Sequence, residues 1–187
     1  MTVFDKAVFK RTYSVLVENE PGVLSRVSGL FSARGYNILS LSVGETNDHT
    51  MSRMTIVVEG TPTVLEQVNK QLNKLIPVIS VLPLIDDEMV SRELIMVKVK
   101  DDDGLEACIQ KFQAEDKMIS VVHHAAGTTL LQFVVSPADR EEIFKGLEQF
   151  TLKEVCRSGA IAMSKTRNFS YFEKSDSRDG QITSKVS

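Results

Sequence analysis

Four consecutive residues near the N-terminus, Asn19, Glu20, Pro21 and Gly22, have the chemistry to bind a small zwitterion. They lie between a segment with strand-like alternation and an apolar helical stripe. The first turn of a helix leaves backbone N–H groups unpaired and carries a partial positive charge, so it can hold a carboxylate. The Asn19 amide can donate or accept a hydrogen bond, and the carboxylates of Glu18 and Glu20 suit an ammonium group. These residues therefore favour an amino acid as ligand.

A purely structural role also explains the same residues. Asn19 or Glu20 can simply cap the helix, which is the more frequent case for an arbitrary strand, turn and helix. Pro21 suits the first helical position, because it lacks an N–H and its φ is fixed. Gly22, in contrast, supports the ligand interpretation, because it has no side chain and lets another group approach the backbone closely. The residue types alone leave both interpretations open.

The elements that position this turn are a strand and an amphipathic helix. Tyr13, Val15 and Val17 alternate with their neighbours, which predicts the strand. Apolar residues then recur with the spacing of one helical face. These residues are Val23, Leu24, Val27, Leu30 and Phe31. Gly35 is a usual helix stop.

The rest of the first half predicts a hairpin, a second helix and a closing strand. Residues 38–45 and 52–59 alternate as strands on either side of the polar residues 46–50. In the first of them Leu39, Leu41 and Val43 are expected to share a face. A helix follows, with Thr61 as N-cap and Pro62 at its first position. Its stripe up to Pro77 comprises Val64, Leu65, Val68, Leu72 and Leu75, and residues 78–82 form the last strand.

This β-α-β-β-α-β order predicts an α+β fold of the ferredoxin-like type. Both helices are expected on one face of a four-stranded antiparallel sheet, with the other face uncovered. The order recurs after the acidic connector at residues 86–88. Strands are predicted at 91–100, 118–123, 129–135 and 152–155, with one helix after Gly104 and another starting at Pro137. Two ferredoxin-like units therefore make up the chain.

The expected organisation is an extension at 1–10, a first domain at 11–84, a linker at 85–90, a second domain at 91–165 and a tail at 166–187. The tail is polar and without period, which predicts disorder. Three aromatic residues in it, Phe169, Tyr171 and Phe172, are able to dock on the protein itself or on a partner.

Composition excludes several classes of function. In 187 residues, 42% are hydrophobic and no apolar run approaches the roughly twenty residues of a membrane span, so we expect a cytoplasmic protein. The net charge of −3 opposes nucleic-acid binding. Cys108 and Cys156 have no metal-ligand or CxxC spacing, which predicts buried free thiols. No Walker or GxGxxG motif occurs, and neither His123 nor His124 has the partners that a thiol nucleophile at Cys156 requires.

Three segments carry a resemblance to a known family. They are residues 24–38 (LSRVSGLFSARGYNI), 41–48 (LSVGETND) and 52–60 (SRMTIVVEG). They resemble the regulatory, or small, subunit of acetolactate synthase, whose N-terminal part is an ACT domain, a ferredoxin-like module that senses amino acids. The match extends over residues 13–83. The ends of the second half, residues 91–99 and 156–164, resemble the family's C-terminal domain, whereas residues 113–117 and 135–137 depart from its pattern.

The resemblance implies an effector site at the seam of two paired ACT domains. Asn19, Gly22 and Val23 of one copy would meet Asn37 and Ile38 of a second copy. The complete set of expected site residues is Asn19, Glu20, Pro21, Gly22, Val23, Leu24, Asn37 and Ile38. Helix-start amides would take the carboxylate of valine or a related branched-chain amino acid, and Val23 and Ile38 would flank its aliphatic group. The alternatives are a turn role with positive φ for Asn37 and ordinary core roles for Val23 and Ile38.

The resemblance also implies a non-catalytic regulatory subunit of acetolactate synthase, which condenses two pyruvates or pyruvate with 2-oxobutyrate. The larger catalytic partner would hold thiamine diphosphate, Mg²⁺ and FAD, and this chain would hold no cofactor. It would activate the partner and transmit feedback inhibition. A second hypothesis is a free-standing ACT-type sensor that is not tied to this enzyme.

Overall fold

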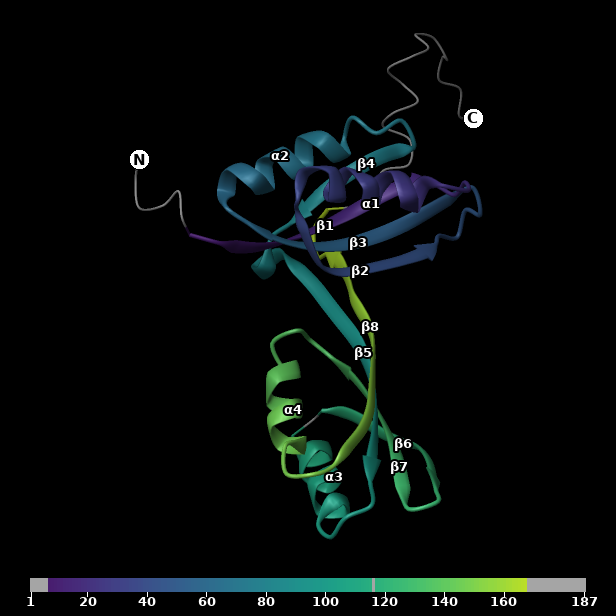
Figure 1. Ribbon diagram of the computed structural model, residues 1–187, viewed down its shortest axis with the longest axis vertical. Coiled ribbons are helices and arrows are strands. Elements are labelled where there is room, and N and C mark those ends of the chain that lie inside the picture. The colour runs from purple at the N-terminus through teal and green to yellow at the C-terminus, as the bar shows by residue number, and fades with distance from the viewer. Residues whose placement is uncertain (1–6, 116, 168–187) are drawn as a thin grey trace, which may run out of the picture.

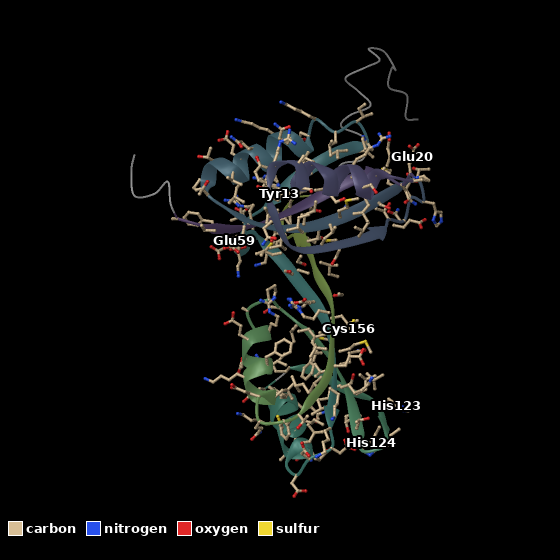
Figure 2. The ribbon with its side chains drawn as sticks, viewed as in Figure 1. Tyr13, Glu20, Glu59, His123, His124 and Cys156 are labelled. Atoms are coloured by element: carbon tan, nitrogen blue, oxygen red, sulfur yellow. The ribbon has the colours of Figure 1, made fainter. Side chains whose placement is uncertain are left out.

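The computed structural model describes residues 7–115 and 117–167, which form two lobes joined by two long strands (Figure 1). Strands β5 (Met89–Lys100) and β8 (Leu152–Ser164) run from beneath the upper, N-terminal lobe into the lower one (Figure 1). Tyr13 lies inside the upper lobe, whereas His123, His124 and Cys156 belong to the lower lobe (Figure 2).

Each lobe contains one four-stranded antiparallel sheet. The first lobe runs β1 (Phe9–Glu18), α1 (Val23–Arg34), β2 (Asn37–Glu45), β3 (Met51–Gly60), α2 (Pro62–Leu72) and β4 (Val78–Leu84). The second comprises β5, α3 (Leu105–Ala114), β6 (Met118–Ala125), β7 (Thr128–Val135), α4 (Arg140–Leu147) and β8. The sheet orders are β2-β3-β1-β4 and β6-β7-β5-β8. The predicted α+β class with two β-α-β-β-α-β units is confirmed. A short 3₁₀ turn, η2 (Asp86–Glu88), joins them.

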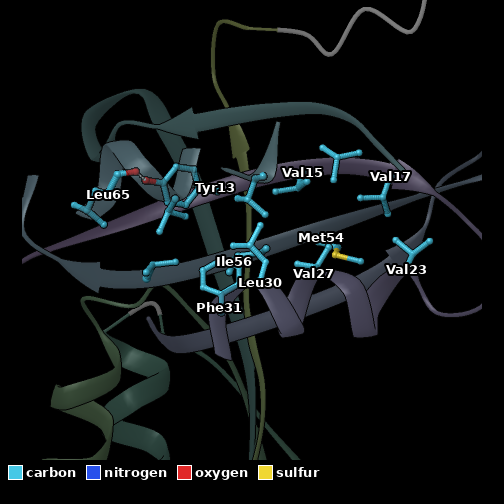
Figure 3. Packing of buried hydrophobic residues seen from close by; sticks show 14 residues of the cluster. Tyr13, Val15, Val17, Val23, Val27, Leu30, Phe31, Met54, Ile56 and Leu65 are labelled. Carbon is cyan, nitrogen blue, oxygen red and sulfur yellow. Dashed lines mark hydrogen bonds between the residues drawn. The ribbon is translucent and has the colours of Figure 1, made fainter. Parts of the chain in front are cut away.

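The core of the first lobe lies between its sheet and the two helices (Figure 3). The predicted periodicities hold here, since Met54, Ile56 and Val58 of β3 are buried against α1. Tyr13 is 1% exposed, and its hydroxyl donates to the Leu65 carbonyl oxygen at 2.6 Å. Burial raises the pKa of Tyr13 to about 12. This side chain therefore fastens β1 to α2 at the centre of the lobe.

The second lobe has its own core of the same design. Ile95, Val97 and Val99 of β5 are buried, as their alternation predicted. Phe112 of α3 packs edge-on against Phe133 of β7, with ring centroids 5.8 Å apart.

Two prolines do not stand where the sequence placed them. Pro21 and Pro137 were expected at first helical positions, but α1 begins at Val23 and α4 at Arg140. Pro21 instead precedes Gly22, whose φ of 87° and ψ of −5° are those of the third residue of a type II turn. Proline has a suitable φ for both positions, so its presence alone cannot distinguish them. Thr61 and Pro62 do begin α2 as predicted, with the Thr61 hydroxyl accepting from the Val64 N–H.

Strand β2 also departs from its predicted alternation. Its register with β3 shifts between Ile38 and Ser40, which places an extra residue in the strand. Ile38 and Leu41 consequently pack against the core, while Leu39 is 41% exposed and Val43 is 46% exposed. A bulge depends on the partner strand, so alternation along β2 alone could not predict it.

Strand β8 is the largest difference between prediction and structure. A short strand at 152–155 was expected, but β8 extends over 13 residues to Ser164. Its C-terminal part packs beneath β2 and β3, on the face of the first sheet that was expected to be uncovered. The prediction of an uncovered face is therefore wrong for this part of the sheet.

Other boundaries differ by smaller amounts. Strand β1 begins at Phe9, inside the extension expected at 1–10, and β5 begins at Met89. The prediction of buried thiols is wrong, because Cys156 is exposed and Cys108 is half-buried. Partial burial still raises the pKa of the Cys108 thiol. The aromatic residues at 169, 171 and 172 lie outside the described residues.

Candidate functional site

The start of α1 presents backbone donors to an open space. The Val23 N–H donates to the Glu20 carbonyl at 3.3 Å, and Arg26 N–H donates to the Gly22 carbonyl at 3.0 Å. The N–H groups of Leu24 and Ser25 have no intrahelical acceptor at these positions. No side chain caps this helix start within the described chain, and a Cβ built on Gly22 would meet nothing within 4 Å. The turn is thus able to receive a carboxylate.

The start of α3 provides a comparison within the same chain. Gly104 has a φ of 90° and a ψ of −5°, and Leu105 N–H donates to the Asp102 carbonyl at 3.2 Å, so the backbone geometry matches that at Gly22. Here, however, the first helical turn contains Glu106, and two acidic residues, Asp102 and Asp103, come directly before Gly104. Only the first lobe therefore combines this geometry with a first turn free of acidic side chains.

Asn19 does not cap α1. Its Nδ2 donates to the His49 carbonyl at 2.9 Å, and its Oδ1 accepts from Ser52 Oγ at 3.0 Å. Its backbone N–H donates to the Thr50 carbonyl at 2.7 Å. The capping interpretation is therefore wrong for Asn19, and also for the exposed Glu20, since no side chain caps this helix. Asn19 fastens the end of β1 to the loop between β2 and β3, which positions the turn.

That loop is itself held by local hydrogen bonds. Asp48 Oδ1 accepts from the Thr50 N–H at 2.9 Å and from Thr50 Oγ1 at 2.7 Å. These bonds hold the pKa of Asp48 below its ordinary value. The loop therefore offers a fixed His49 carbonyl to Asn19.

The apolar residues at the helix start have opposite environments. Val23 is 5% exposed and belongs to the core, as its structural interpretation predicted. Leu24 is 46% exposed beside the free amides. In a single chain, therefore, Leu24 rather than Val23 provides the accessible apolar surface next to the turn.

Asn37 and Ile38 lie at the other end of α1. Gly22 and Gly35 flank this 12-residue helix and are 13 positions apart, so at 1.5 Å per residue they are separated by about 20 Å. Asn37 is the exposed first residue of β2, and Ile38 packs partly against the core. The turn interpretation of Asn37 is wrong, because Asn37 does not have a positive φ and belongs to strand β2. In the described ranges the non-glycine residue with a positive φ is Ala126. One chain does not bring the two halves of the expected site together.

Three hydroxyl groups connect this region to the second lobe. Ser42 Oγ donates to the Ser158 carbonyl at 2.9 Å, and Ser40 Oγ accepts from Ala160 N–H at 2.9 Å. Thr55 Oγ1 accepts from Ala162 N–H at 3.3 Å. Sequence reasoning missed these contacts. The available signal was the recurrence of serine on one face of β2. That signal is weak, because serine is equally common on the solvent-exposed face of a strand.

Gly159 lies at the centre of this contact. Its φ is 75°, and a Cβ built on it would stand 2.7 Å from Ser40 Oγ. The register between β5 and β8 shifts at this point, between Glu93 and Ile95. A glycine is therefore needed both for the bulge of β8 and for its close approach to β2.

The cysteine and the two adjacent histidines of the second lobe lie on different strands. Cys156 lies on β8, whereas His123 and His124 lie near the end of β6 (Figure 2). His124 Nδ1 is 2.9 Å from Thr129 Oγ1 and 3.5 Å from an Asp101 carboxylate oxygen. Within residues 7–115 and 117–167, no three His, Cys, Asp or Glu side chains gather as metal ligands, and no helix has the length and hydropathy of a membrane span.

Comparison with known families gives two matches that together span both lobes. Residues 13–80 match the model of the AHAS small subunit-like ACT domain. Residues 92–166 match the model of the small subunit of acetolactate synthase.

Individual proteins give the same result. The chain is 42% identical over 158 residues to an acetolactate synthase small subunit of Mycolicibacterium smegmatis, covering 82% of this chain and 90% of that one. It is 43% identical over 159 residues to a probable acetolactate synthase small subunit of Archaeoglobus fulgidus, covering 82% and 96%. The crystal structure of an acetolactate synthase small subunit from Thermotoga maritima superimposes with a TM-score of 0.76 at 29% identity, covering 86% of this chain and 99% of that chain.

Proposed function

The chain belongs to the family of acetolactate synthase small subunits, and from this premise we propose that it activates the catalytic large subunit and makes it sensitive to valine or a related branched-chain amino acid. The observation that carries the proposal is the start of α1. The backbone N–H groups of Leu24 and Ser25 are unpaired there, the space around Gly22 is open, and the Leu24 side chain is exposed. These groups match the carboxylate and the aliphatic side chain of such an effector.

The geometry of β2 supports pairing with a second copy. Strand β2 is an edge strand, so one row of its backbone N–H and C=O groups lacks a neighbouring strand. Asn19 is bonded to the loop that follows β2, so the start of α1 lies at the same end of the lobe as Glu45. In an antiparallel β2–β2 pair, the start of one strand lies beside the end of the other. Asn37 of a second copy would then approach Gly22 of the first.

Each part of the effector would find a partner at this seam. Helix-start amides would bind its carboxylate, and Asn37 of the second copy would orient its ammonium group through the amide oxygen. Leu24 and Ile38 would flank the aliphatic side chain, because Val23 is committed to the core of its own lobe. Asn19 would act on the ligand through the turn that it positions.

Strand β2 would also transmit the signal. Asn37 and Ile38 lie at its start, and Ser40 and Ser42, which bond to β8, follow within four residues. A shift of β2 on effector binding would therefore reach the strand that enters the second lobe. The effector can change the activity of the catalytic partner only if it binds more tightly to one arrangement of the paired small subunits than to another. Thiamine diphosphate, Mg²⁺ and FAD would be held by that partner.

The function is tested by the rate of the catalytic subunit with and without this chain. We expect the chain to raise the rate, and valine, leucine or isoleucine to lower the raised rate. A chain that neither co-purifies with the catalytic subunit nor changes its rate would favour the alternative of a free-standing sensor.

Replacing Asn37 with alanine is expected to weaken effector binding by about ten- to a hundredfold. A hydrogen bond to a charged group contributes roughly 1.5–3 kcal/mol, which corresponds to that change in affinity. Calorimetry of valine binding measures it. Asn73→Ala, which removes the same amide from the C-cap of α2, is the control. Equal valine affinity for Asn37→Ala and wild type would remove Asn37 from the site.

A further inference from the structure

A cavity of about 870 Å³ lies where the two lobes meet. The first lobe contributes walls from β1, β2 and β3, through Lys10, Leu39 and Val57 among others. The second contributes β5, β8 and the segment that leads into α4. A ligand in this cavity would therefore contact both lobes, and such junctions are common places for small-molecule sites.

The walls of the cavity carry a charge opposite to that of the chain. Five basic side chains line it, Lys10, Arg92, Arg140, Arg157 and Lys165, against two acidic ones, Asp86 and Glu93. The chain as a whole has a net charge of −3. The junction is therefore locally positive on a chain that is negative overall.

One buried carboxylate organises the basic wall. The Glu93 side chain is 1% exposed, and its Oε1 accepts from Arg157 Nε at 2.8 Å and Nη2 at 2.7 Å. Its Oε2 lies 3.5 Å from Arg140 Nη1. One negative charge thus holds two guanidinium groups, so one positive charge is left uncompensated. Each guanidinium has five N–H donors, and those not directed at Glu93 remain for another acceptor.

Other cations of the cavity are directed at neutral groups. Lys165 Nζ donates to the Asp87 carbonyl at 3.0 Å, and Arg92 Nη1 donates to the Ser91 carbonyl at 2.8 Å. Main-chain carbonyls orient these side chains but do not neutralise their charge. The excess positive charge therefore extends beyond the two arginines.

We propose that this cavity binds a small organic polyanion that carries phosphate or carboxylate groups. Guanidinium pairs recognise both groups with paired hydrogen bonds, and a carboxylate that fixes the guanidiniums beforehand lowers the cost of ordering them. Leu39, Val57 and Ala160 supply apolar surface for the body of the ligand. This inference does not depend on the effector site, from which the cavity is separate in its lining residues.

Calorimetry on the full chain at low salt tests the proposal with two probes, inorganic pyrophosphate and citrate. We expect at least one probe to bind with 1:1 stoichiometry, and the probe that binds identifies phosphate or carboxylate as the preferred group. Arg140→Gln is expected to weaken that binding tenfold or more, because Glu93 keeps Arg157 while the cavity loses the positive charge that Glu93 leaves uncompensated. Arg140→Lys should retain part of the affinity, since it keeps the charge.

Two further variants keep the test decisive if Arg140→Gln unfolds. Lys10→Gln removes an exposed cation of the cavity without touching Glu93, and it should also weaken binding. Lys70→Gln, on the exposed face of α2, is the matched control and should change nothing. Absence of binding of both probes to the wild type at millimolar concentration, or equal weakening by Lys70→Gln, would overturn the proposal. Neither result would bear on the proposed valine site, which calorimetry with valine tests separately.

Discussion

Replacing Gly22 with aspartate is expected to abolish valine inhibition while activation of the catalytic subunit persists. The new carboxylate would stand at the start of α1, where we propose that the carboxylate of the effector binds. Two like charges about 4 Å apart repel by roughly 4 kcal/mol at an effective dielectric constant of 20, so we expect valine affinity to fall by a hundredfold or more. There is space for the side chain, since nothing lies within 4 Å of a Cβ at this position.

Gly22→Asn is the matched control for this change. Both residues must adopt the φ of 87° that Gly22 has, and asparagine and aspartate tolerate this conformation better than most residues. Asparagine has the same size but no charge, so it should retain more valine affinity than aspartate. Enzyme rate against valine concentration and calorimetry measure the two effects. Unchanged valine inhibition in Gly22→Asp would show that the effector binds elsewhere.

Replacing Gly159 with alanine is expected to destabilise the chain and to separate valine binding from its effect. The added Cβ would stand 2.7 Å from Ser40 Oγ at a φ of 75°. A left-handed conformation costs a non-glycine residue roughly 1–2 kcal/mol, and the steric overlap adds to it. For a chain of this size about 2–3 kcal/mol lowers Tm by roughly 4–12 °C. Valine should still bind, but inhibition of the catalytic subunit should weaken, because β8 is displaced from β2.

A double-mutant cycle with Ser40→Ala separates the two causes of this loss. Removing the Ser40 hydroxyl relieves the closest contact of the new Cβ and leaves both the backbone strain and the 3.1 Å approach to Ser42 Oγ. The double variant should therefore be more stable than the sum of the single changes predicts, by about 0.5 kcal/mol or more. Gly29→Ala is the control, because Gly29 is an exposed helical glycine with nothing within 4 Å of its Cβ position. That change should be neutral or slightly stabilising. Equal stability of Gly159→Ala and wild type would contradict the proposed contact.

Local patterns predicted most of the elements and their buried faces. The alternation of Met54, Ile56 and Val58 and the helical stripe of α2 needed no partner to be recognised, because the 2-residue and 3.6-residue periods are properties of one segment. Predictions failed where one residue type favours two different local conformations. Proline suits both a helix start and a turn, so Pro21 and Pro137 were misplaced.

Contacts distant in sequence were outside the reach of such patterns. The bulge in β2 depends on its register with β3, and the length of β8 depends on β5 and on the sheet of the other lobe. The cysteine prediction failed for the same reason, since the burial of Cys108 on α3 and of Cys156 on β8 is decided by what packs against each element rather than by the element itself. The hydroxyl contacts of Ser40 and Ser42 with β8 span more than 100 positions.

For the candidate site, the sequence by itself determined the chemistry: a turn at Pro21 and Gly22 followed by a helix offers free amides wherever it is placed. Only the tertiary structure decided that Asn19 bonds to the loop after β2, that Val23 is buried while Leu24 is exposed, and that Asn37 lies at the far end of α1. The physical reason is that hydrogen-bonding capacity belongs to the residue, whereas distance and burial belong to the packing of the whole chain.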